Sequence, residues 1–246
     1  MTRHKLQRHH EAIHPDVYVP VGTKLTAVQR AYAAWLWSKR CGIVAGQSAA
    51  ALHGAKWVDA GQPAQLIYGH RRPPPGIRTW SDTVADDEIQ LIGDVPVTTA
   101  ARTAFDLACR SPLGKAVAAV DALARATRLK TADVELLAEG HKGHRNIRRA
   151  RRALTLGDAG AESPRETWLR LLVIEAGYRR RKPRYRFTAH TENLSRLSTW
   201  VGRTSKSRSN EGDHHRTDRR IFGRTSNAMR RYPNWVGSPS ESRLNT

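Results

Sequence analysis

The sequence is poor in cysteine and lacks long apolar runs. Its 246 residues include two cysteines, Cys41 and Cys109, which are too few for a disulfide framework. No stretch of about 18 consecutive apolar residues occurs that could form a transmembrane helix, and the N-terminal residues do not resemble a signal peptide. We therefore expect a cytoplasmic protein with no membrane partner.

Acidic residues are also scarce. The chain has 22 Asp and Glu against 42 Lys and Arg, which gives a formal net charge of +20. The excess is uneven, because residues 179–246 hold 17 Lys and Arg against 5 Asp and Glu. Basic blocks are typical of arms that bind nucleic acid, so DNA is the partner that the charge favours. Apolar residues still make up 39% of the chain, which excludes a fully disordered basic protein.

The hydrophobic pattern predicts a mixed α/β fold, with helices and short strands alternating over the first two thirds of the chain. The predicted strands cover residues 17–19, 65–68, 77–80, 89–92 and 95–97. The predicted helices cover residues 3–13, 26–40, 48–53, 99–109, 113–127, 131–139 and 144–154. A last helix is expected to begin with a capping box at Ser163-Pro164-Arg165-Glu166 and to run to Gly177.

Two of these helices carry side chains with an expected role. In the helix over residues 26–40, the expected buried face consists of Val28, Ala31, Tyr32, Trp35 and Leu36. In the helix over residues 144–154, arginines cover most of the circumference, so we expect it to bury little. This helix is either a solvated face or a contact for phosphates, and the candidate nucleic-acid-binding residues are Arg145, Arg148, Arg149 and Arg152.

The segment from Val17 to Trp57 resembles the N-terminal module of AbiEi-type antitoxins of type IV toxin–antitoxin systems. The matching residues are Val17-Tyr18-Val19, the alanine-rich helix around Ala31, and Gly46-Gln47-Ser48-Ala49-Ala50-Ala51-Leu52-His53-Gly54. The resemblance implies a truncated winged-helix DNA-binding region over residues 1–60, followed by an α+β middle region over residues 61–157. It also implies a cognate toxin as a partner. The alternative is that Ser48–Gly54 is simply a tightly packed helix.

The C-terminal part resembles actinobacterial proteins whose second half is similar to very-short-patch-repair endonucleases, which belong to the PD-(D/E)XK class. Two motifs carry this likeness, Ala161-Glu162-Ser163-Pro164-Arg165-Glu166 and Glu211-Gly212-Asp213-His214. The resemblance implies a restriction-endonuclease-like α/β domain over residues 158–246. Such nucleases hold Mg²⁺ with hard carboxylate oxygens against the scissile phosphate, so the resemblance also implies acidic site residues. The implied catalytic residues are Glu162, Glu166, Glu211 and Asp213, with Glu162 and Glu211 as the metal ligands. For Glu166 the alternative is a helix cap.

The stretches 179–210 and 225–246 lack both the alternation of a strand and the aspartate that this family needs. We interpret them as translated out of their ancestral frame and disordered. A shifted reading frame permits a strand-like sequence with an acid there, and the codons of Trp200 and Val201 then force a glycine. We therefore expect a nucleic-acid-associated, antitoxin-like protein whose degenerate nuclease domain is inactive as the sequence stands. The alternatives are a Mg²⁺-dependent DNA endonuclease, or an antitoxin that binds its toxin by protein–protein contact.

Overall fold

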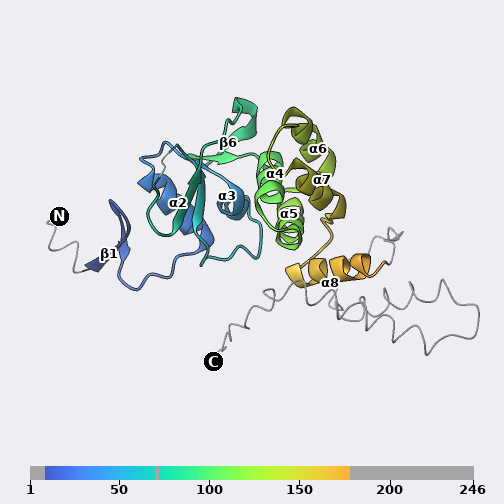
Figure 1. The fold of residues 1–246 in the computed structure, drawn as a ribbon. Helices are drawn as coiled ribbons and strands as arrows, with labels where there is room; N and C mark the ends of the chain where they lie inside the picture. The colour runs from blue at the N-terminus through green and yellow to red at the C-terminus, as the bar shows by residue number, and fades with distance from the viewer. Residues whose placement is uncertain (1–8, 70–71, 178–246) are drawn as a thin grey trace, which may run out of the picture. The chain divides into compact units, whose positions relative to one another are not determined.

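The computed structural model describes residues 9–69 and 72–177 (Figure 1). The chain divides into a compact unit over residues 1–168 and a second unit over residues 169–246. The stretches 179–210 and 225–246 lie outside the described residues, as do Glu211 and Asp213, so the interpretations placed on them stay predictions. Within the described part of the chain, no helix combines the length and the apolar character needed to cross a membrane.

The fold is mixed α/β, as predicted. The strands are β1 (His10–His14), β2 (Val17–Pro20), β3 (Ile43–Val44), β4 (Ala64–Ile67), β5 (Ile77–Trp80), β6 (Ile89–Ile92) and β7 (Val95–Thr98). The helices are α2 (Ala27–Trp37), α3 (Gly46–Leu52), α4 (Ala100–Arg110), α5 (Leu113–Thr127), α6 (Thr131–Gly140), α7 (Ile147–Leu156) and α8 (Pro164–Glu175), with a 3-10 turn η1 (Asp86–Glu88) before β6.

Five strands form the central sheet in the order β5-β4-β3-β7-β6. The two-residue strand β3 lies in its middle, where Val44 pairs with Leu66 of β4 and with Val97 of β7. All three side chains are fully buried and belong to the main hydrophobic core. Strand β3 belongs to residues 1–60 and the other four strands belong to residues 61–157. The sheet therefore joins the predicted N-terminal region to the predicted middle region.

Helices cover this sheet and extend the core away from it. Helices α2 and α3 contact β4, and α3 also contacts α4. Helix α4 then contacts α5, α6 and α7, so that α4 and α5 separate the sheet from α6 and α7 (Figure 1). The unit over residues 1–168 therefore has a sheet-centred part and a helical part that share α4.

The N-terminal segment differs from the prediction of a helix over residues 3–13. In its described part, His10–His14 form β1, which pairs antiparallel with β2. The turn between the two strands contains Pro15 and Asp16, and Asp16 adopts a left-handed φ of 63°. Pairing with β2 provides hydrogen-bond partners for the backbone N–H and C=O groups of β1. The spacing of basic residues along this segment gives no information about such pairing.

The buried face of α2 also differs from the prediction. Ala31 and Trp35 are buried as expected, but Ala33 and Ala34 are buried too. Val28 and Tyr32 are instead 43% and 45% exposed. The helix presents its small alanines to α3 and β4, because small side chains allow these elements to approach closely.

Candidate nucleic-acid interface

The predicted Ser163 cap at the start of α8 forms, but Glu166 reaches back to the N–H of Glu162 and not to that of Ser163, so the capping box is not complete. The Glu166 carboxylate accepts the Glu162 backbone N–H at 2.9 Å and the Ser163 hydroxyl at 3.2 Å. The Glu166 N–H in turn donates to the Ser163 hydroxyl oxygen at 3.4 Å. Both carboxylate oxygens are therefore engaged in starting the helix.

The Glu162 carboxylate faces a cation. Its oxygen lies 3.5 Å from a guanidinium nitrogen of Arg125 on α5. Within residues 9–69 and 72–177, no group of three or more His, Cys, Asp or Glu side chains is placed to hold a metal ion. Glu162 and Glu166 thus do not by themselves fit the Mg²⁺ site that the nuclease resemblance implies. The roles predicted for Glu211 and Asp213 fall outside the described residues.

Helix α7 is more amphipathic than its arginines suggest. We expected it to bury little, yet Ala150, Ala153 and Leu154 are buried against α4 and α5. At about 3.6 residues per turn, these three residues share one side of the helix. The arginines therefore gather on the remaining circumference.

Arg149 has an intramolecular partner. Its guanidinium donates to the backbone carbonyl of Cys109, and the Asn146 side-chain amide donates to the same oxygen at 3.1 Å. Cys109 lies in the last turn of α4, where backbone carbonyls have no partner within the helix and carry the negative end of its dipole. Arg149 is half-buried, and its contact holds the start of α7 against the end of α4.

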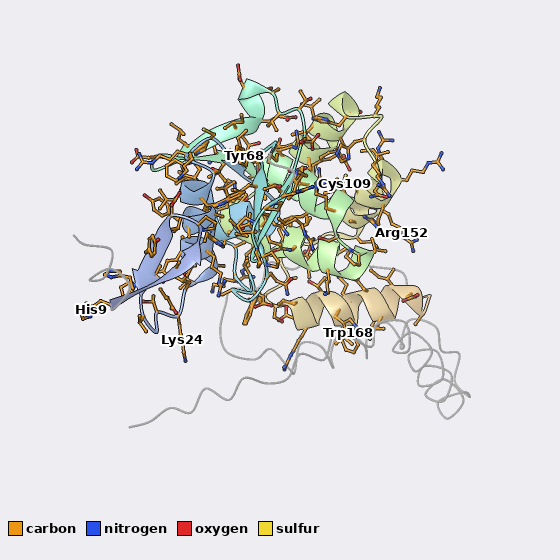
Figure 2. The ribbon with its side chains drawn as sticks, turned by 60° about the vertical axis from the view of Figure 1, so that its left-hand side comes forward. His9, Lys24, Tyr68, Cys109, Arg152 and Trp168 are labelled. Atoms are coloured by element: carbon orange, nitrogen blue, oxygen red, sulfur yellow. The ribbon has the colours of Figure 1, made fainter. Side chains whose placement is uncertain are left out.

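The exposed arginines lie opposite the buried side of α7. We call Arg148, Arg151 and Arg152 the arginine stripe; all three are exposed, and Arg145 is exposed just before the helix. Figure 2 shows Arg152 on the outer side of the helices, with Cys109 inside them. None of the ion pairs among the described residues involves the stripe. Residues 141–157 also contain no Asp or Glu, so the local charge is strongly positive.

Besides the exposed arginines of α7, the structure contains a buried cluster of charged side chains around Arg102, which was not predicted from the sequence. The fully buried guanidinium of Arg102 on α4 contacts three carboxylates. They belong to Asp82 at 2.7 Å, to Asp106 at 3.2 Å, and to Glu88. The available signal was an arginine and an aspartate four residues apart in a helix whose other residues are mostly apolar.

Burial and charge act in opposite directions on this cluster. Burial raises the pKa of Asp106, and its second carboxylate oxygen has no hydrogen-bond partner among the described residues. Burial also raises the pKa of Glu88, but hydrogen bonds from His141 and Arg102 and the charge of Arg102 outweigh it and hold that pKa below its ordinary value. Arg102 is fully buried and three carboxylates of the protein match its charge, so we assign the cluster a structural role.

A pocket of about 170 Å³ lies beside the start of α8. One wall consists of Ala118, Ala122 and Ala126, which are spaced four residues apart on α5. Trp57 also lines it, and its indole N–H donates to the Glu162 backbone carbonyl at 3.3 Å. The sequence reasoning missed this pocket, although the four-residue alanine spacing was a visible signal of a helix face without bulk.

Comparisons with the models of known protein families, with curated proteins and with solved structures find no match to this chain.

Proposed function

We propose that this protein binds nucleic acid through the phosphate backbone, and that the arginine stripe on α7 is part of the contact surface. The observation that carries this proposal is the placement of Arg148, Arg151 and Arg152 on the solvent side of a helix whose other side is packed. In keeping with the AbiEi resemblance, we propose an antitoxin-like protein that acts by binding.

Physical chemistry supports phosphates as the ligand. A guanidinium is always charged and presents a planar set of donors that fits phosphate oxygens. Arg148 and Arg152 are one turn apart, about 6 Å along the helix axis, and can contact neighbouring phosphates. Each phosphate that is neutralised releases condensed counterions, so the binding is expected to be sensitive to salt and largely independent of sequence. The net charge of +20 acts in the same direction.

The test compares two triple variants that lose the same net charge. In the first, Arg148, Arg151 and Arg152 are changed to Gln. In the second, three exposed cations outside α7, namely Lys24, Arg78 and Lys115, are changed to Gln. Affinity for a labelled mixed-sequence DNA duplex is measured by fluorescence anisotropy with the full chain.

We expect the stripe variant to lose at least about tenfold in affinity and the control variant to lose less than about threefold. Equal losses would show that only net charge matters, which would contradict a contact at α7. A wild-type chain that does not bind the duplex would overturn the proposal.

A further inference from the structure

We infer that the pocket beside Trp57 takes an unpaired base of single-stranded nucleic acid, with the base stacked on the indole and a neighbouring phosphate held by Lys56. This inference deepens the proposed function and rests on it. It is carried by the exposure of Trp57, the way its ring is held, the shape of the pocket and the charges at its rim.

Trp57 is exposed to an unusual degree for its size. The residue is 65% exposed, although large aromatic side chains normally supply buried surface. Its backbone has a φ of 67°, in the left-handed region that bulky residues rarely adopt. Such strain persists where the surrounding structure imposes it, and it is commonly found at ligand sites.

The indole ring is held in place by a contact across the fold. Its N–H donates to the backbone carbonyl of Glu162, which is 105 residues away in the sequence. This bond satisfies the only polar group of the side chain. The indole is thus left with its apolar surface for a ligand, and that surface is suited to stacking on a flat, uncharged ring.

The pocket has room for such a ring. Ala118, Ala122 and Ala126 form one wall, and a longer side chain at any of these positions would extend into the space. The volume of about 170 Å³ greatly exceeds the roughly 10–15 Å³ that holds one water molecule. A group of several ring atoms can therefore enter the pocket that the alanines and Trp57 line.

The charges at the rim favour an anionic chain attached to that ring. Lys56 is exposed next to Trp57 and has no ion-pair partner among the described residues. A guanidinium nitrogen of Arg125 lies 3.5 Å from a carboxylate oxygen of Glu162, so these two charges compensate each other. The Asp121 carboxylate in the wall accepts the Thr167 hydroxyl at 2.7 Å and the Asp158 backbone N–H, so its charge is compensated within the protein. A flat ring linked to phosphate is the chemistry of a nucleotide in a single strand.

The experiment measures the full chain against three labelled probes. These are an oligothymidine strand of about 12 nucleotides, within the usual range of single-strand sites, an abasic strand of the same length, and a duplex. We expect tighter binding of oligothymidine than of the abasic strand. Trp57→Ala should reduce affinity for oligothymidine roughly tenfold, since stacking on an aromatic ring contributes that order per base, and change the other two affinities less than twofold. Trp57→Phe keeps a ring but loses the N–H bond to Glu162, so its affinity for oligothymidine should lie between those of the wild type and Trp57→Ala.

A second variant covers the case in which Trp57→Ala disturbs the fold. Ala122→Leu fills the pocket without changing the indole, and it should cause the same selective loss for oligothymidine, with an unchanged circular dichroism spectrum. Equal binding of the oligothymidine and abasic strands by the wild type, or an equal loss for all three probes in Trp57→Ala, would overturn the inference. Duplex binding that still depends on the arginine stripe would leave the proposed function standing. Absence of binding to every probe would overturn both.

Discussion

The guanidinium Nε of Arg102 lies 3.2 Å from a carboxylate oxygen of Asp106, one turn further along α4, and neither side chain is exposed to solvent. The same guanidinium also contacts Asp82 and Glu88, which precede β6 in the chain. Arg102 therefore ties the helical part of the fold to the loop that leads into the sheet. Removal of a buried cation leaves its carboxylates buried and uncompensated, which costs more than the ion pairs contribute while intact.

Arg102→Met is expected to lower the free energy of unfolding by about 3–5 kcal/mol, because three carboxylates lose the Arg102 charge and only Asp82 keeps an arginine partner, Arg110 at 3.1 Å. Arg152→Met is the matched control, since Arg152 is exposed, and it should change stability by less than about 0.5 kcal/mol. Urea denaturation followed by circular dichroism measures both. Similar destabilisation by the two variants would show that the buried cluster does not stabilise the fold.

The depressed pKa of Glu88 predicts acid sensitivity. Its pKa lies below the ordinary value of 4.5 in the folded state, so the unfolded chain binds this proton first as the pH falls. The stabilisation is therefore complete above about pH 4.5 and is lost as the pH falls through the folded-state pKa. As the pH is lowered from about 6 through the folded-state pKa of Glu88, the free energy of unfolding of Glu88→Gln should fall less than that of the wild type. Urea titrations at a series of pH values measure this difference. Asp87→Asn, at an exposed neighbour, should follow the wild type; if Glu88→Gln does so as well, the pKa is not depressed.

The two cysteines should differ in reactivity. Cys41 is exposed, whereas burial, aided by the charge of Asp106, raises the pKa of the Cys109 thiol to about 11. Because the thiolate is the reactive form, Cys109 should be inert in the folded protein at mildly alkaline pH. A thiol-reactive disulfide reagent should label one thiol per chain in buffer and two in denaturant. Rapid labelling of both thiols in buffer would mean that the core around Cys109 is open.

Substitutions at Glu166 distinguish a helix cap from a catalytic residue that acts with Mg²⁺. Glu166→Ala removes the acceptor for the Glu162 N–H and should cost about 1 kcal/mol, whereas Glu166→Gln keeps an acceptor and should cost less than about 0.5 kcal/mol. Thermal unfolding with and without Mg²⁺ measures both effects. A Tm that rises with Mg²⁺ in the wild type and not in Glu166→Gln would instead support the catalytic role that the nuclease resemblance implies for Glu166.

Local pattern was sufficient to predict most elements of the fold. The strands at residues 77–80 and 89–92 and the helix at residues 113–127 coincide with β5, β6 and α5, because each has a clear hydrophobic period. Strand β3 was missed because two residues are too few to show a period. Strand β1 was missed because its backbone is satisfied by pairing with β2.

The candidate site was predictable only in part. The solvent exposure of Arg148 and Arg152 agrees with a helix rich in arginine. The bond from Arg149 to Cys109 joins residues 40 apart in the chain. The bond from Trp57 to Glu162 spans 105 residues. Hydrophobic periodicity does not reveal contacts of this range, since they depend on how α7 packs against α4 and on where the loop after α3 meets the segment before α8.

The most direct test of phosphate binding by α7 is the salt dependence of DNA affinity. The logarithm of the association constant for a duplex is measured against the logarithm of salt concentration for the wild type, the stripe variant and the control variant. Each phosphate contact contributes about 0.9 to the slope, so loss of Arg148, Arg151 and Arg152 should reduce its magnitude by about 2 to 3. The control variant should give a line nearly parallel to the wild type. A stripe variant with the wild-type slope would contradict the account, because it would show that the arginines of α7 do not contact phosphates.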